Sequence, residues 1–292
     1  MGKKRETAME CRARVTVLGA RGSIPVSGAQ YQIYGGATSC VLLETGVDGS
    51  GSSQAVIFDA GSGIMNLPDR IWKEHAKVHV FFSHFHLDHL LGIPMSRMLF
   101  DETAQVIFYA QEGDRIGEVF GQMMKEPLWP VGLEAFRADI SYRSIGKQPV
   151  ILGDGADSAD ESALVILSAM HVTHPGGAAA FRADWGGHSM VYATDCDPDE
   201  DEARALSAFA AGTDLFILDA QYTDAEYEQC RGFGHSSIRM ASQLITSSKA
   251  KKGLLFHHAP ARTDVQMVEL ERQLQQYRAY ISFAREGESI II

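Results

Sequence analysis

The stretch VHVFFSHFHLDHLLGIP, residues 78–94, constrains this chain more than any other part of its sequence. It begins as an almost wholly apolar run, which is the pattern of a strand buried on both faces. Three histidines and an aspartate then follow within six residues, as His84, His86, Asp88 and His89. Alternate side chains of an extended segment face the same way, so these donors can converge where the strand meets a turn. Imidazoles and carboxylates are ligands that Zn²⁺ accepts, and burying them unpaired is costly, so the element indicates a metal centre.

Further donors stand at the ends of three other predicted strands. HVTHPGG places His174 before a turn, MVYATD ends on Asp195, and GLLFHHAP ends on the pair His257 and His258. Repeated placement of such side chains at strand ends is what a site along one edge of a sheet sandwich requires. Seven donors suit two metal ions better than one.

Strand and helix patterns recur in both halves of the chain, which predicts a layered α/β fold. Residues 67–75, 90–100, 199–212, 236–250 and 265–280 have helical patterns, and apolar strand patterns lie between them. No fixed-period repeat is visible, so residues 1–292 are expected to form a single domain.

Net charge and composition argue against nucleic acids and membranes as binding partners of this chain. The formal net charge of −11 argues against a broad nucleic-acid surface, because such binding depends on Lys and Arg neutralising phosphates. No apolar window approaches the roughly 20 residues that span a bilayer. The four cysteines are scattered, without the paired spacing of a zinc knuckle or a disulfide framework. We therefore expect a cytoplasmic protein without membrane contact and without long RNA or DNA as a partner.

The elements HFHLDH, HPGG, YATD and FHHAP, in that order, resemble the metallo-β-lactamase superfamily in its dinuclear hydrolase branch. The resemblance covers nearly the whole chain. Within the superfamily, TVLGARGSIP, YGGATSCVLLE and GHSS are similar to the ribonuclease Z and cyclic-nucleotide phosphodiesterase side. The resemblance implies an αββα sandwich, in which two mixed β-sheets pack face to face between helices and carry the site at one edge.

The resemblance assigns the donors to two divalent metal ions, with one aspartate bridging both. The ligands that it implies are His84, His86 and His174 for the first ion, Asp88, His89 and His258 for the second, and Asp195 as the bridge. The family position in FHHAP matches the second histidine, so His258 is expected, and His257 is the alternative. Zinc is the expected metal, although Mn²⁺ and Fe²⁺ accept the same ligand set.

The motif GFGHSS suggests a catalytic histidine, because His235 stands just before a predicted helix. In phosphodiesterase-like relatives the histidine of this element faces the substrate phosphate; the plainer alternative is a surface histidine beside a helix cap. We expect catalysis to depend on Asp88 and on His235, which would protonate the leaving oxygen. The expected activity is metal-dependent hydrolysis of a small or cyclic nucleotide, a small-molecule phosphodiester, by an activated water.

Two alternatives stay open from the sequence. Ribonuclease Z-like RNA processing normally uses a Gly-rich, basic arm, which is not visible here, and acidic residues outnumber basic ones between Phe100 and Tyr142. That segment is expected to cover the pocket instead. A non-hydrolytic, PqqB-like accessory protein is the other alternative, and the intact ligand set argues against it. A homodimer is compatible with either.

Overall fold

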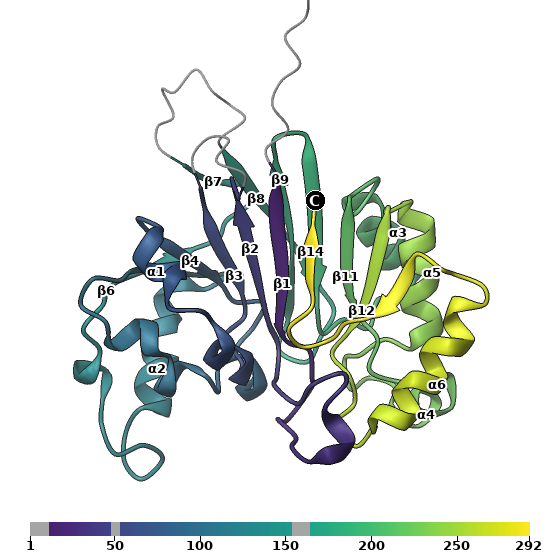
Figure 1. The fold of residues 1–292 in the computed structure, drawn as a ribbon, viewed down its shortest axis with the longest axis horizontal. Coiled ribbons are helices and arrows are strands. Elements are labelled where there is room, and N and C mark those ends of the chain that lie inside the picture. The colour runs from purple at the N-terminus through teal and green to yellow at the C-terminus, as the bar shows by residue number, and fades with distance from the viewer. Residues whose placement is uncertain (1–11, 48–52, 154–163) are drawn as a thin grey trace, which may run out of the picture.

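Two β-sheets form the centre of the structure, a computed structural model that describes residues 12–47, 53–153 and 164–292 (Figure 1). In the first sheet the strand order is β14-β1-β2-β3-β4-β5-β6, and in the second it is β13-β12-β11-β10-β9-β8-β7. The strands of the first sheet are β1 (Ala13–Gly19), β2 (Cys40–Thr45), β3 (Ala55–Phe58), β4 (Val78–Phe81), β5 (Gln105–Ala110), β6 (Asp139–Ser144) and β14 (Ser289–Ile291). Those of the second are β7 (Val150–Leu152), β8 (Val165–Val172), β9 (Ala178–Trp185), β10 (His188–Ala193), β11 (Leu215–Asp219), β12 (Lys252–Phe256) and β13 (Ile281–Phe283).

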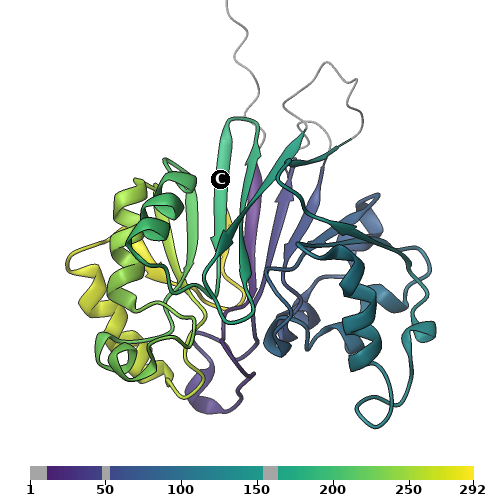
Figure 2. The same ribbon diagram turned by 180° about the vertical axis from the view of Figure 1, so that it is seen from behind.

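Helices cover the outer face of each sheet. The α-helices are α1 (Arg70–Glu74), α2 (Ile116–Met123), α3 (Glu200–Phe209), α4 (Asp224–Cys230), α5 (Ile238–Ser248) and α6 (Asp264–Gln275). Figure 1 shows α1 and α2 on the side of the first sheet and the other four on the side of the second, and the view from behind shows the same separation (Figure 2). The expected αββα sandwich of two mixed sheets is confirmed, because both sheets contain parallel and antiparallel pairs.

Short 3₁₀ turns make up much of the remaining regular structure in the described residues. They are η1 (Ala29–Tyr31), η2 (Ser62–Asn66), η3 (Leu87–His89), η4 (Ile93–Met95), η5 (Arg97–Phe100), η6 (Gly113–Arg115) and η7 (Leu133–Ala135). The helix predicted over residues 90–100 is therefore wrong, since η4 and η5 take its place. Ser96 has an extended backbone between them, which interrupts the helical hydrogen bonds. No helix of the described chain combines the length and the apolar character that crossing a membrane requires.

The inner faces of the two sheets pack against each other through aromatic side chains. Phe58 of β3 stacks on Phe181 of β9 and on Tyr192 of β10, with ring centroids 5.9 and 5.4 Å apart. Separate apolar clusters join each sheet to its own helices, through residues such as Phe120 of α2 and Leu206 of α3. Burial on both faces explains why the strands read as continuous apolar runs.

The parallel strands fix the position of the site. In the first sheet β3, β4 and β5 run parallel, and in the second β10, β11 and β12 do so. Residues that follow the carboxyl ends of parallel strands gather at one edge of a sheet, which is where open α/β sheets bind ligands. The segments after β4, β10 and β12 carry His84, His86, Asp88, His89, Asp195, His257 and His258, whereas His174 follows the antiparallel strand β8.

Candidate active site

The first donor cluster consists of His84, His86 and His174. Nε2 of His174 lies 3.0 Å from Nδ1 of His86, and the ring of His84 lies 4.4 Å from that of His86 and 4.7 Å from that of His174. Each ring offers one nitrogen to the cluster, and these three nitrogens lie within 4.8 Å of one another. Three imidazoles converge as the sequence predicted.

Hydrogen bonds leave two of these rings with a lone pair directed into the cluster. Nδ1 of His174 donates to the carbonyl oxygen of Gly234 at 2.8 Å, so its Nε2 is the free acceptor. Nδ1 of His84 contacts Oγ of Ser83 at 3.1 Å, and its buried Nε2 has no hydrogen-bond partner among the described residues. Burial lowers the pKa of His84 well below its usual value, which favours the neutral, ligating form.

The second donor cluster combines Asp88, His89, Asp195 and His257, all of them buried. Nε2 of His89 lies 3.4 Å from Oδ2 of Asp88 and 3.2 Å from Oδ2 of Asp195. Nε2 of His257 lies 3.1 and 3.3 Å from the same two oxygens. Two carboxylates and two imidazoles thus enclose one point.

Asp195 faces both clusters. Its Oδ2 belongs to the second cluster, whereas its Oδ1 lies 3.9 Å from Nε2 of His84 and 3.8 Å from Nε2 of His174. Burial alone would raise the pKa of Asp195, but His257 and His89 hold it well below its usual value. An ionised carboxylate with one oxygen toward each cluster has the geometry of a bridging ligand.

The expectation that His258 joins the second cluster is wrong, because the structure places His257 there. Nε2 of His258 donates to the carbonyl oxygen of Ala284 at 2.8 Å, and its fully buried ring packs edge-on against Tyr34 and Phe283. Backbone geometry explains the exchange: β12 ends at Phe256, and His257 has a φ of 59°, which breaks the alternation of side chains.

Three residues of the site share this left-handed backbone. Asp59, Asp195 and His257 have φ values of 58°, 54° and 59°, and each stands one or two residues beyond a parallel strand. Non-glycine residues seldom adopt this region, and such strain concentrates at functional sites. The conformation turns each side chain away from the direction that strand alternation would give it.

Sequence reasoning did not single out Asp59, which orients the second cluster. Its Oδ2 accepts from Nδ1 of His89, from Oγ of Ser83 and from the hydroxyl of Tyr192, each at 2.8 Å. Its Oδ1 accepts from the Ser83 amide at the same distance. Nδ1 of His89 is therefore protonated, and its buried Nε2, without a hydrogen-bond partner in the described chain, points at Asp88 and Asp195. The available signal was an aspartate directly after a buried strand, in IFDAGSG.

The turn Gly22-Ser23-Ile24 holds the carboxylate of Asp88 in place through a backbone hydrogen bond. The Ser23 amide donates to Oδ2 of Asp88 at 2.7 Å, and Nε2 of Gln221 donates to the Ser23 hydroxyl at 3.0 Å. Gly22 is required by close approach, because a Cβ there would lie 2.5 Å from Nδ1 of His257.

His235 lies beside both clusters, as the sequence predicted. Its Nδ1 donates to Oδ2 of Asp219 at 3.0 Å, and its ring stacks on His257 with centroids 4.8 Å apart. Asp219 also accepts from the backbone amides of Cys196 and Ser236, both at 3.2 Å. Burial would lower the pKa of His235, but Asp219 outweighs it and raises that pKa to about 9. Asp219, which the sequence reasoning also missed, therefore orients this imidazole and favours its protonated form.

The donor set fits divalent metal ions. His84 and His89 each bury a nitrogen without a hydrogen-bond partner in the described residues, at the points where their clusters converge. Two carboxylates supply the negative charge that a pair of dications requires. Without such ions, these buried, unpartnered groups would cost free energy.

Comparisons with known proteins agree with this fold. A family model described as β-lactamase superfamily domain matches residues 54–258. A ribonuclease Z from Haloferax volcanii is 22% identical over 317 residues, covering 95% of this chain and 94% of its own. The metallo-β-lactamase fold protein YhfI from Bacillus subtilis superposes with a TM-score of 0.69 at 17% identity, over 97% of this chain and 100% of its own. A diphosphatase from the PhnP family superposes with a TM-score of 0.65 at 20% identity, over 96% and 97%.

Proposed function

The chain belongs to the β-lactamase superfamily and is a metallo-β-lactamase-fold hydrolase, and from this premise we propose that it is a dinuclear phosphodiesterase for small nucleotides. The observation that supports the proposal is the position of Asp195 between the two clusters, with Oδ1 near His84 and His174 and Oδ2 near His89 and His257. In this assignment His84, His86 and His174 hold one ion, Asp88, His89 and His257 hold the other, and Asp195 contacts both.

A pair of divalent ions supplies Lewis-acid chemistry, in which a water is activated and the charge of a phosphodiester is neutralised. The protein's part is to hold the donors at fixed positions. Asp59 fixes the ring of His89, Gly234 fixes that of His174, and the Ser23 amide fixes the carboxylate of Asp88. Donors held in advance need no reorganisation during the reaction, which favours electrostatic stabilisation of the transition state.

His235 is positioned to donate a proton to a leaving oxygen. Its Nδ1 is engaged by Asp219, so Nε2 is the atom available to a substrate. Asp219 favours the charged imidazole, whereas two nearby dications would oppose it and move the pKa of His235 back toward neutrality. An acid with a pKa near the working pH is effective in general acid catalysis.

A small substrate is favoured over a long RNA by charge. The chain carries a net charge of −11, whereas an RNA backbone is bound mainly by Lys and Arg. Similarity to the Haloferax volcanii ribonuclease Z over 95% of this chain nevertheless supports RNA processing as a second candidate. The two candidates share the metal centre and differ in what lies around it.

Metal analysis and a substrate panel test the proposal together. Protein purified without chelator should hold close to two transition-metal ions per chain. It should hydrolyse bis(p-nitrophenyl) phosphate and at least one cyclic mono- or dinucleotide, with little turnover of a precursor transfer RNA. One ion or none after reconstitution would contradict the dinuclear assignment. Turnover confined to the precursor RNA would favour the second candidate.

A further inference from the structure

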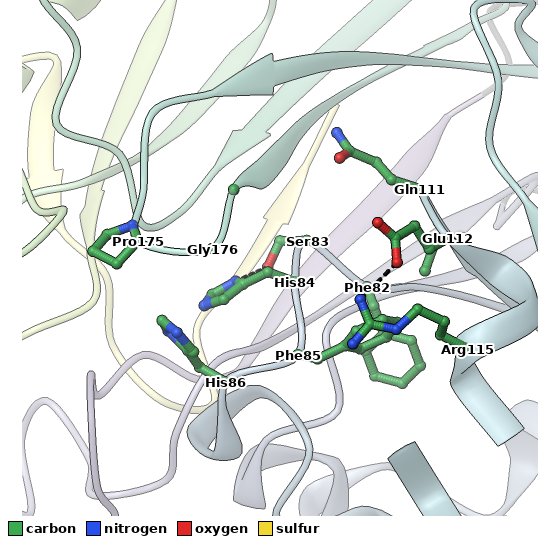
Figure 3. A pocket seen from close by; sticks show the side chains of 12 residues that line it. Phe82, Ser83, His84, Phe85, His86, Gln111, Glu112, Arg115, Pro175 and Gly176 are labelled. Carbon is green, nitrogen blue, oxygen red and sulfur yellow. Dashed lines mark hydrogen bonds and ion pairs between the residues drawn. The ribbon is translucent and has the colours of Figure 1, made fainter. Parts of the chain in front are cut away.

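A cavity of about 270 Å³ opens beside the three-histidine cluster (Figure 3). Its lining comes from residues 82–86 after β4, from 110–112 and Arg115 after β5, and from 175–177 after β8. Figure 3 shows His84 and His86 on one side and Gln111, Glu112 and Arg115 on the other. Small-molecule sites usually occupy about 300–1,000 Å³, so this cavity has room for one compact group.

One part of the lining is aromatic and apolar. The half-buried Phe85 supplies the accessible aromatic ring, and the fully buried Phe82 packs behind it, with the two ring centroids 6.2 Å apart. The buried Ala110 continues this surface at the end of β5. An aromatic wall of this kind suits a flat ring, because planar groups stack on it at little cost in entropy.

The opposite part of the lining is polar and has no net charge. Nη1 of Arg115 contacts Oε2 of Glu112 at 2.6 Å, with both side chains exposed. The carboxylate only accepts hydrogen bonds, the guanidinium only donates, and the amide of Gln111 does both. Such a set recognises an uncharged group with hydroxyls and ring nitrogens, whereas a second phosphate would require a cation without a carboxylate partner.

The contact between Glu112 and Arg115 is easily exchanged. Exposed ion pairs contribute little to stability, so a ligand can replace part of this pair at little cost. Both residues lie in the short segment between β5 and α2, within reach of a group bound beside His84 and His86. The cavity is thus formed before ligand binding, and its polar rim can adjust.

We propose that this cavity binds the nucleoside of a mononucleotide whose phosphate lies at the two donor clusters. The base packs on the ring of Phe85, and the sugar hydroxyls donate to Glu112. Arg115 and Gln111 donate to ring or sugar oxygens and nitrogens. The inference rests on the proposed function, and it specifies one uncharged nucleoside rather than a polynucleotide or a second phosphate group.

Product binding separates the nucleoside from the phosphate. Adenosine 5′-monophosphate and inorganic phosphate are each titrated into the metal-loaded protein by calorimetry, and their inhibition constants against bis(p-nitrophenyl) phosphate are measured alongside. The wild-type protein should bind the nucleotide more tightly than phosphate. Glu112→Gln and Arg115→Ala should each weaken nucleotide binding about 10-fold and leave phosphate binding unchanged. The matched controls are Glu269→Gln and Arg272→Ala, an exposed pair with the same i,i+3 spacing on α6, which should change neither.

The outcomes distinguish this inference from the proposed function. If the wild-type protein bound nucleotide and phosphate equally, the inference would be overturned. Hydrolysis of the diester by the same protein would still support the proposed function. Equal weakening of both ligands in Arg115→Ala would also overturn it, because Arg115 would then contact the phosphate. Absence of any diester hydrolysis would count against the function, and the calorimetric comparison would still decide whether the cavity takes a nucleoside.

Discussion

Nδ1 of His89 donates to Oδ2 of Asp59 across 2.8 Å, and both side chains are completely buried. The bond fixes the tautomer and the ring plane of His89, so Nε2 points at the carboxylates of Asp88 and Asp195. The hydroxyl of Tyr192 reaches the same oxygen of Asp59 from the second sheet. Asp59 thus links His89, which follows β4 of the first sheet, to Tyr192 of the second, while Ser83, also after β4, holds the same carboxylate.

Replacing Asp59 should weaken metal binding without removing a ligand. Asp59→Asn leaves His89 without a charged acceptor, and such partners are worth about 10- to 100-fold in metal affinity. Competition against a chelator of known affinity measures the change. Tyr192→Phe is the matched control: it removes another hydrogen bond to the same carboxylate, and should cost about 1 kcal/mol of stability with metal affinity nearly unchanged. Unchanged affinity in Asp59→Asn would contradict the role given to Asp59.

The pair His257 and His258 offers a test by neighbouring substitutions. His257→Ala should lose about one metal equivalent and nearly all activity, because a ligand of the second cluster is removed. His258→Ala should keep both metal equivalents and lower the free energy of unfolding instead, since its ring is buried against Tyr34 and Phe283. Elemental analysis together with urea unfolding of both variants gives the readout. The reverse pattern would restore His258 as the ligand.

Substrates with different leaving groups test the role of His235. His235→Ala should keep both metal ions and lower turnover of a cyclic nucleotide by roughly 10²- to 10⁴-fold. The same variant should lose far less on bis(p-nitrophenyl) phosphate, whose p-nitrophenolate departs without a proton. Asp219→Asn should reproduce this selectivity in weaker form, because it removes the charge that favours the protonated form of His235. Similar losses on both substrates would mean that His235 binds phosphate, and loss of a metal ion would make it a ligand.

His79 predicts a dependence of stability on pH that is separate from the metal centre. Burial in β4 lowers the pKa of His79 to about 4, and its Nδ1 contacts the hydroxyl of Tyr109. In the unfolded chain the imidazole has a pKa near 6.5 and binds a proton more readily than in the folded protein. The free energy of unfolding is therefore unaffected by His79 titration above pH 6.5 and decreases as the pH falls from 6.5 toward 4. The loss is on the order of 3 kcal/mol.

Chelator-treated protein is suited to the measurement, since metal release also depends on pH. Urea unfolding of the wild type and of His79→Gln between pH 4 and 7.5 gives the free energy of unfolding of each. The difference between the two proteins should shrink or reverse as the pH falls. A constant difference across that range would show that His79 does not contribute to the acid sensitivity.

Much of the site followed from residue type and strand ends. The structure brings HFHLDH, His174 and Asp195 together, and each of them stands after an apolar run. Parallel strands carry HFHLDH and Asp195 to one edge, whereas His174 follows the antiparallel strand β8. His257 was misjudged because its left-handed backbone reverses the direction that alternation predicts. Asp59 and Asp219 were missed because a single carboxylate has no spacing pattern, and their partners, Tyr192 and His235, are far away in the sequence. The predicted single domain over residues 1–292, the homodimer and the cytoplasmic location stay predictions.

Four of the donors, His84, His86, Asp88 and His89, are neighbours in the chain, whereas His174, Asp195 and His257 arrive from far along it. The contiguous four remain close together even when the polypeptide is unfolded. An unfolded chain can thus already capture a metal ion, weakly, before the distant ligands exist around it. Affinity of the unfolded state for the ion subtracts from the stability that the ion gives the native state. A nascent chain could in this way bind a metal ion before it folds, and an excess of that ion would raise the free energy of unfolding less than native-state affinity alone suggests.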